Sequence, residues 1–275
     1  MNYKNREKVI AHSIFLLGSL IVLYPFISIL FLALSEPGTR ISGFTVPTGI
    51  YFDNFIKAWT GGGFSNGLLN SFIVVIGVVS VTIFCSTLAA YAFEKLDIFG
   101  VTPLFALLLL GLVLPYESIV ISLYYSMKSY GLTNTHWSLI LPQIGLSIPF
   151  SIFWLRASFR SIPKSLSEAA MIEGASRFII LTKILIPQIL PAIFTLTVLL
   201  FVWTWNEFLL ALIMIQDADM RTAPLALSYF AGNKRYGDPA ITAAAAIWVA
   251  LPVLIVYIFL QRRFISGMVT GSIKE

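Results

Sequence analysis

Six stretches of the 275-residue chain contain no Asp, Glu, Lys or Arg, and five of them are at least 20 residues long. They cover residues 10–34, 68–93, 101–116, 136–155, 184–206 and 239–261. About 20 apolar residues in a helix cross the ~30 Å hydrocarbon core of a bilayer, where every backbone polar group must be paired internally. Because only Glu117 separates the third stretch from more apolar sequence up to Met127, we predict six membrane-spanning helices.

The composition excludes most other classes of protein. Hydrophobic residues make up 58% of the chain and charged residues only 11%, whereas a soluble domain carries roughly 25% charged residues. The alternating pattern of a β-barrel is absent. A net charge of +5, with the basic residues between apolar runs, favours lipid headgroups over nucleic acid as the anionic partner. One cysteine, Cys85, allows no disulfide within the chain, and no catalytic or metal-ligating cluster is found.

We therefore expect an all-α membrane protein with one domain, residues 1–275. Its spans are expected near 10–34, 68–93, 101–127, 136–157, 184–214 and 239–261. Twelve of the 18 Lys and Arg residues lie in segments 1–9, 94–100, 156–183 and 262–275, which places both termini in the cytoplasm. The first stretch is longer than the 7–15 residues of a signal-peptide core, so we expect it to be retained. Outer loop 35–67 has room for a short helix near residues 52–59.

The inner segment 156–183 is too long for a simple turn. Pro163 suits the first turn of a helix, and Ser165 followed by Glu168 fits a capping box. Gly174 then predicts the end of this helix, and a second helix is expected to begin near Ser176 and to continue into the fifth span. A short helix of this kind lies on the membrane surface or docks into a groove of a soluble partner, and the residues alone leave both readings open.

The same segment carries a recognisable pattern. Glu168, Ala169 and Ala170 are followed at fixed spacings by Gly174, Ile184 and Ile186-Pro187. This pattern resembles the EAA loop of ATP-binding-cassette (ABC) importer permeases, with Ile186 where that family has Leu. The wider sequence is similar to the smaller, maltose-type permeases of the carbohydrate branch. The similar segments include 148–163, 205–210, 236–238, 251–253, 261–264 and the tail 267–274.

The resemblance implies a cytoplasmic coupling helix in loop 158–183, between spans 4 and 5. It implies a heterodimer with a second permease subunit, two ATPase subunits that bind Mg-ATP, an extracytoplasmic solute-binding protein, and a bacterial-type inner membrane. By the same resemblance Glu168 anchors the helix at the ATPase, and Gly174 allows a turn that any Cβ would obstruct. This chain has no G-x-x-x-x-G-K-[ST] phosphate loop, so we expect no cofactor and no enzyme activity in it.

Glu117 and Glu207 are the only acidic residues inside the expected spans, which makes them candidates for the substrate path. Trp203, Trp205 and Asn206 stand beside Glu207, and aromatic faces with amide or carboxylate groups suit a polyhydroxylated ligand. The alternative is an aromatic belt at the membrane interface. A sugar or oligosaccharide is the expected substrate, with a polyol, a glycerol-phosphate or a compatible solute as alternatives. A secondary transporter would carry inverted repeats and charged midplane residues, which are not evident.

Overall fold

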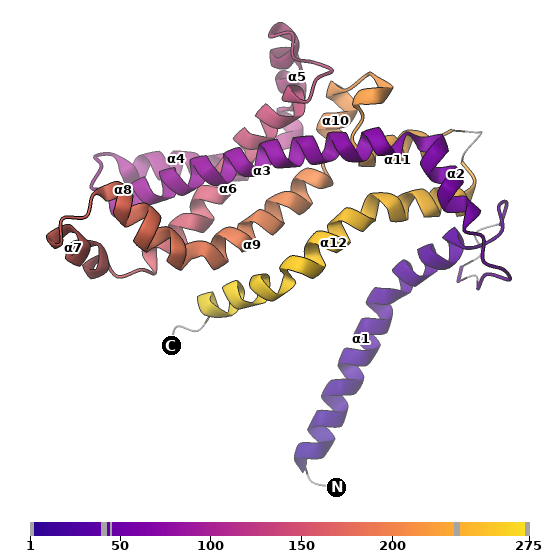
Figure 1. Ribbon diagram of the computed structural model, residues 1–275, viewed down its shortest axis with the longest axis horizontal. Coiled ribbons are helices and arrows are strands. Elements are labelled where there is room, and N and C mark those ends of the chain that lie inside the picture. Colours follow the sequence, from indigo (N-terminus) through magenta and orange to yellow (C-terminus); the bar gives the residue numbers. More distant parts are fainter. Residues whose placement is uncertain (1–2, 40–42, 45, 234–236, 273–275) are drawn as a thin grey trace. The chain divides into compact units, whose positions relative to one another are not determined.

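A computed structural model describes residues 3–39, 43–44, 46–233 and 237–272, with side chains from Glu7 to Leu260 within these ranges. All of its regular elements are helical (Figure 1). In chain order they are α1 (Tyr3–Ala33), α2 (Asp53–Gly62), α3 (Phe64–Lys95), α4 (Val101–Val113), the 3-10 turn η1 (Tyr116–Ser118), α5 (Val120–Ser129), α6 (Trp137–Arg160), α7 (Lys164–Ile172), α8 (Arg177–Ile179), the π-helix η2 (Ile180–Leu185), α9 (Ile186–Trp205), α10 (Leu209–Met214), the 3-10 turn η3 (Ala218–Met220), α11 (Ala223–Ala231) and α12 (Pro239–Ser272).

The expected all-α membrane fold is confirmed. Five helical segments within the described ranges are long and apolar enough to cross a membrane, and α4 is a shorter apolar helix. The five segments are Glu7–Ala33, Phe64–Lys95, Trp137–Arg160, Arg177–Trp205 and Pro239–Leu260. The short helix expected near residues 52–59 is present as α2.

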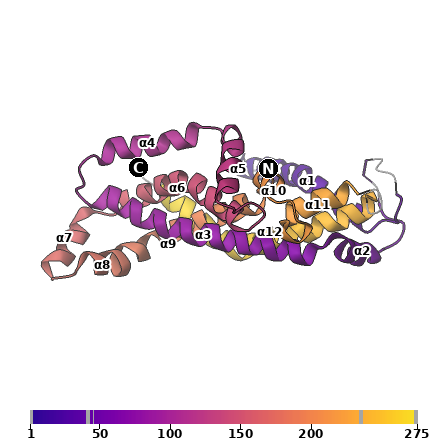
Figure 2. The same ribbon diagram turned by 90° about the horizontal axis from the view of Figure 1, so that it is seen from above.

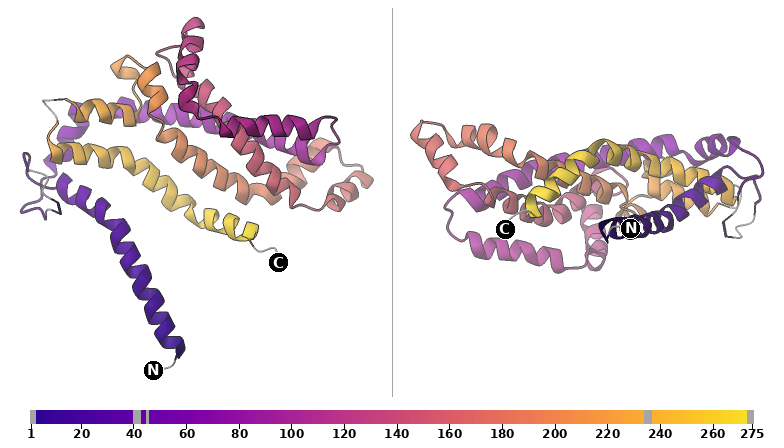
Figure 3. Two further views of the ribbon diagram at one scale, coloured as in Figure 1. Left: turned by 180° about the vertical axis from the view of Figure 1, so that it is seen from behind. Right: turned by 90° about the horizontal axis from the view of Figure 1, so that it is seen from below.

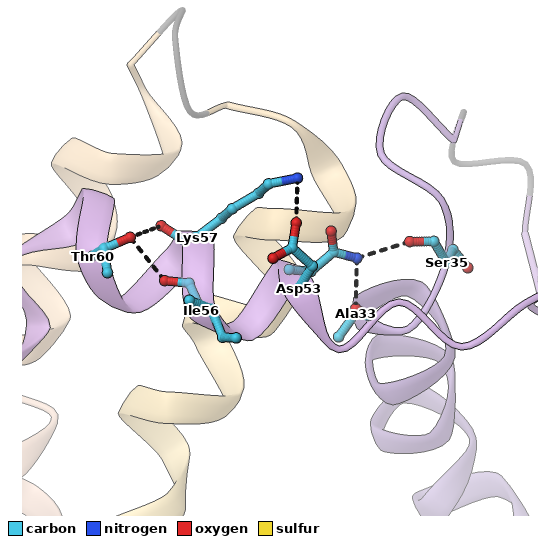
Figure 4. A network of polar contacts seen from close by, with 7 residues as sticks. Ala33, Ser35, Asp53, Ile56, Lys57 and Thr60 are labelled. Carbon is cyan, nitrogen blue, oxygen red and sulfur yellow. Dashed lines mark hydrogen bonds and ion pairs between the residues drawn. The ribbon is translucent and has the colours of Figure 1, made fainter.

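The chain divides into two compact units, one within residues 1–65 and 226–251, the other within 66–225 and 252–275. In the first unit, the buried Asn54 side chain donates hydrogen bonds to the carbonyls of Ala33 and Ser35, at 2.9 and 2.8 Å (Figure 4). The side chain of Asn54 therefore fixes the path of the chain between α1 and α2. In the same unit, Trp248 packs edge-on against Trp59, with ring centroids 4.9 Å apart.

In the second unit, α6 packs against both α9 and α4. Helices α7 and α8 lie at one end of α9, and α5 and α10 lie at the other end (Figures 1 and 3). Buried apolar side chains of α3, α5, α6 and α10, with Ile215 after α10 and Leu225 of α11, form the core at that second end. Its members are Val74, Val78, Val120, Met127, Leu139, Ile140, Leu210, Ala211, Met214, Ile215 and Leu225.

The third expected span is not one continuous helix. Helix α4 ends at Val113, and Leu114 and Pro115 are extended. The 3-10 turn η1 follows, and α-helix resumes only at α5 (Figure 2). Proline disfavours helical geometry in the residue before it and has no N–H for the helix ladder, so Pro115 ends α4. With 13 residues at 1.5 Å each, α4 is about 20 Å long, which is short of a full crossing.

The fifth span begins with a π-helix, which the sequence did not predict. Pro187 offers no N–H to the carbonyl of Lys183, and the six residues Ile180–Leu185 adopt π geometry just before it. The Gln188 side chain donates to the neighbouring Ile184 carbonyl at 3.2 Å. The span ends at Trp205, and α10 follows as a separate short helix, so the expected segment 184–214 contains a break at Asn206 and Glu207.

Parts of the resemblance fall outside the described residues. Tyr236 and the tail residues 273–275 are not described, and neither are the side chains beyond Leu260, which include the segment 261–264.

Candidate functional site

The inner loop, residues 158–183, folds into the helix–turn–helix that its sequence predicts. Helix α7 begins at Lys164, and Ser176 caps the following helix by accepting a hydrogen bond from the Ile179 N–H at 3.4 Å. The predicted capping box is wrong. Pro163 occupies the N-cap position and no side chain caps α7, because the helix starts one residue before Ser165 and leaves that hydroxyl inside the first turn.

Gly174 ends α7 as predicted, through a Schellman motif. Its φ is +83°, the Gly174 N–H donates to Met171 O at 3.0 Å, and the Ala175 N–H donates to Ala170 O at 2.9 Å. The expected obstruction of a Cβ is not found within this chain, because a Cβ on Gly174 would meet no atom within 4 Å. The glycine is therefore required for its left-handed backbone conformation and not for space.

Helix α7 exposes a row of apolar side chains. Ile172 is 88% exposed, and Met171 and Leu166 are also exposed. Glu168 and Ala169 are exposed on the same short helix. No ion pair to Glu168 occurs within the described part of the chain. Large exposed aliphatic groups on a helix that projects from one end of the unit are typical of a docking surface.

Charged side chains tie the start of the inner loop to the end of α3. The Glu94 carboxylate accepts from the Arg156 Nε–H at 2.9 Å, and both side chains are largely buried. The Arg156 guanidinium also lies over the Phe105 ring of α4, 4.1 Å from its centroid. The neighbouring Lys95 donates from Nζ to the Ile162 carbonyl at 2.7 Å, one residue before Pro163. The Lys95 hydrogen bond thus ties the loop before α7 to the end of α3, and the Arg156 contacts tie the end of α6 to α3 and α4.

A second candidate site is a pocket of about 410 Å³ in the second unit. It is lined by residues of α4, η1, α6 and α9, by Leu114 and Pro115 before η1, and by Glu207 after α9. We call it the acidic pocket. Its polar lining residues are Glu117, Gln143, Ser147, Thr204 and Glu207, and its aromatic lining residues are Tyr116, Phe150 and Trp203. The two acids that the sequence singled out, 90 residues apart in the chain, therefore line one pocket, and Trp203 lines it with them.

Glu207 holds a defined position at the rim of this pocket. Its Oε1 accepts from the Leu210 N–H at 2.9 Å, at the start of α10, and from the Tyr116 hydroxyl at 3.4 Å. The side chain is therefore placed by the helix break that follows Trp205 and by the turn that follows Pro115. Glu117 makes no hydrogen bond or ion pair within the described residues, so its carboxylate is available to a ligand or water.

The other two members of the predicted cluster lie elsewhere. Trp205 is only 2% exposed and packs against Phe72 and Phe201, with ring centroids 5.0 and 5.6 Å away. The exposed Asn206 donates its side-chain amide to Val202 O at 2.8 Å. Neither residue lines the acidic pocket. Successive residues of a helix point about 100° apart, so residues 203 and 205 face opposite sides of α9.

Two polar lining residues were not singled out from the sequence. Gln143 and Thr204 are each 7% exposed, and the side chain of neither makes a hydrogen bond within the described residues. Their polar atoms are not among the fully buried side-chain atoms without a partner, so they reach the open space of the pocket, where water or a ligand can bond to them. Gln143 could have been found from the sequence, because its amide lies in the middle of an uncharged span, where lipid offers no hydrogen-bond partner.

The family described as "Binding-protein-dependent transport system inner membrane component" matches residues 64–269. The chain belongs to this family. The matched segment contains both the inner loop and the acidic pocket, whereas α1 and α2 precede it.

Two relatives of this family member match it nearly end to end. One is the trehalose transport system permease protein SugB of Mycobacterium tuberculosis (strain CDC 1551 / Oshkosh), 32% identical over 94% of this chain and 96% of SugB. Another is the trehalose/maltose transport system permease protein MalG of Thermococcus litoralis, 31% identical over 98% of this chain and 99% of MalG. The resemblance to carbohydrate ABC permeases is thereby confirmed.

A solved structure confirms the fold of this permease-family chain. It is a chain of a bacterial ABC transporter that imports the acidic polysaccharide alginate, with a TM-score of 0.80 and 23% sequence identity over 96% of this chain and 99% of that chain. At this identity the likeness concerns the fold alone.

Proposed function

We propose that this chain is the permease subunit of an ABC importer for a sugar or oligosaccharide, and that it couples closure of partner ATPase subunits to alternating access. The observation that carries the proposal is α7. It is a short helix with exposed apolar side chains, it ends at a Schellman glycine, and it leads through η2 directly into the fifth span. Force applied to α7 therefore reaches a membrane-spanning helix within a few residues.

The proposed partners follow from this role. Two ATPase subunits that bind Mg-ATP would dock on the inner-loop helices of this chain and of a second permease subunit. Glu168, Ala169, Ala170 and Gly174 would form the docking helix and its turn, and Ile184 and Pro187 would begin the span that moves. The family description names dependence on a binding protein, which supports delivery of solute from outside the cell membrane. This arrangement requires α7, and with it both termini, on the cytoplasmic side.

A carbohydrate is supported by the relatives and by the pocket. SugB and MalG carry the names of trehalose and maltose systems. The acidic pocket combines aromatic faces, carboxylates, an amide and hydroxyls, which suit the C–H faces and hydroxyl groups of a sugar. We place the substrate path at Glu117, Trp203 and Glu207. Trp205 and Asn206 would act on it only indirectly, through packing and through the end of α9.

The experiment is uptake into proteoliposomes that contain the complete complex, with binding protein outside and ATP inside. We expect accumulation of labelled trehalose or maltose that requires ATP, the ATPase subunits and the binding protein together. Accumulation of labelled glycerol, glycerol-phosphate or a compatible solute in place of both sugars would move the substrate to those classes. Uptake by this chain without ATPase subunits, driven by an ion gradient, would contradict the proposal and favour a secondary transporter.

A further inference from the structure

Charge in the acidic pocket is of one sign. Glu117 and Glu207 line it, and no Lys, Arg or His is among the described residues that do. Neither carboxylate forms an ion pair within the described part of the chain. The field of the two carboxylates inside the pocket is therefore not neutralised by a neighbouring cation, and the low-dielectric surroundings of a membrane protein strengthen it.

The polar wall indicates that the pocket is built to hold a hydrogen-bonding ligand. Gln143 and Thr204 are more than nine-tenths buried, their side chains have no partner within the described residues, and both line the pocket. An amide offers two donors and an acceptor, and a hydroxyl offers one donor and an acceptor. Together they match sugar hydroxyl groups, which also donate and accept.

An apolar face completes the lining. Trp203 is 49% exposed, and it meets Phe150 edge-on with ring centroids 4.9 Å apart. The C–H face of a sugar ring packs on such a surface without any need for charge. A sugar seated here would lie within reach of the carboxylates, because the same pocket holds all of these groups.

We propose that the acidic pocket discriminates by charge, accepting uncharged or amine-bearing saccharides and rejecting those that carry carboxylate, sulfonate or phosphate groups. This inference rests on the proposed function and sharpens its substrate class. A second negative charge brought into the pocket is repelled by both glutamates, whereas hydroxyls and an ammonium group gain hydrogen bonds or an ion pair from them. Rejection by like charge is a form of specificity that needs no additional contact with the correct ligand.

The test is saturation-transfer difference NMR on the permease–ATPase complex in nanodiscs, without binding protein, so that only sites in the complex are measured. The probes are three disaccharides of similar size: trehalose, the glucosamine disaccharide of chitosan, and an alginate disaccharide. We expect trehalose and the glucosamine disaccharide to bind at least about tenfold more tightly than the alginate disaccharide. Trp203→Ala should reduce all binding signals, which assigns them to this pocket and not to the second permease subunit.

Neutral variants then isolate the charge. Glu117→Gln combined with Glu207→Gln should bring the affinities for trehalose and the alginate disaccharide to within about threefold, and Glu117→Gln alone, at a position without hydrogen bonds, should close part of the gap. Glu36 is an exposed acid outside the pocket, and Glu36→Gln should leave the difference in affinity unchanged. An equal affinity for all three disaccharides in the wild type, or an unchanged gap in both variants, would overturn the inference while leaving sugar import intact. Absence of any saccharide signal in the wild type would also overturn the inference, whereas the uptake experiment with binding protein tests sugar import separately.

Discussion

Arg156 donates its Nε–H to Glu94 Oε2 across 2.9 Å, two residues before the inner loop begins. The pair joins the last turns of α3 and α6 at the end of the unit from which α7 projects. The side chains are only 16% and 23% exposed, so water compensates poorly for the loss of either partner. This ion pair thus holds the end of α3 to the end of α6, next to the loop that carries α7.

Removing one charge of this pair should destabilise the protein. Glu94→Gln leaves the Arg156 guanidinium without its anionic partner, and we expect a loss of about 2 kcal/mol in the free energy of unfolding. Thermal unfolding in detergent measures it. Arg160→Gln is the control, because Arg160 is 80% exposed and 4.0 Å from Glu94, and it should change stability by less than about 0.5 kcal/mol. An equal loss of stability in the two variants would show that the Glu94–Arg156 ion pair does not stabilise the protein more than the exposed Arg160 does.

The loss of uptake caused by replacing Gly174 should depend on how well the new residue adopts a positive φ, and not on its side-chain volume alone. At φ +83° with open space around the Cβ position, Asn tolerates the conformation best, Ala costs about 1 kcal/mol and the β-branched Val costs more. ATP-driven uptake in proteoliposomes is therefore expected to be highest in Gly174→Asn, lower in Gly174→Ala and lowest in Gly174→Val. Gly18→Ala, in α1 and without positive φ, should leave uptake unchanged. Equal loss in Asn and Val variants would place an obstructing partner atom at this turn.

Reversing the charge at Glu168 should weaken the proposed docking of α7 on the ATPase without unfolding the chain. The side chain is exposed and has no ion-pair partner within the described residues, so Glu168→Lys should change stability by no more than about 0.5 kcal/mol. If Glu168 meets the ATPase, substrate-stimulated ATP hydrolysis and uptake should both fall about tenfold or more. Glu36→Lys, an exposed acid of the outer loop, is the matched control. Normal stimulation and uptake in Glu168→Lys would remove this residue from the docking surface.

Asn70 should be a structural residue of the second unit. Its Nδ2 donates to the carbonyls of Asp219 and Arg221 at 2.7 and 3.0 Å, and its Oδ1 lies 2.9 Å from His136 Nε2. Because the residue is 5% exposed, Asn70→Ala leaves buried groups unpaired and should cost about 2–4 kcal/mol in the free energy of unfolding.

The control for this prediction is Asn206→Ala, at an exposed residue whose amide bonds only to Val202 O. It should change the free energy of unfolding by less than about 0.5 kcal/mol. Thermal unfolding of the two variants side by side is the measurement. A similar shift in both would contradict the structural role of Asn70.

The long spans and the inner loop were predictable because each rests on a local rule. Uninterrupted apolar runs define α3 and α6, and the end of α7 follows from Gly174, since glycine adopts the left-handed conformation at low cost. The break after α4 does not follow from hydropathy, because Pro115 lies within a nearly continuous apolar run. The helix ends there because proline restricts the backbone of the residue before it, and a hydropathy profile contains no information on backbone geometry.

The acidic pocket was predictable only in part. Glu117 and Glu207 stood out as charges in apolar sequence, and helical geometry alone would have separated Trp203 from Trp205. The positions of Gln143 and Thr204 in the same wall depend on how α6 and α9 pack. A single sequence does not define that packing, because many faces of these apolar helices are chemically alike.

The most direct test of the central claim is photo-crosslinking from α7. A benzophenone amino acid at Ile172, the most exposed apolar position of that helix, is irradiated in the intact complex. The docking account predicts an adduct with the ATPase subunit that changes in yield when ATP is bound. It predicts no such adduct from Phe52, an exposed apolar residue in loop 35–67, which this account places on the other side of the membrane. Adducts from Ile172 with lipid alone, with and without ATP, would contradict it and make α7 an interfacial helix.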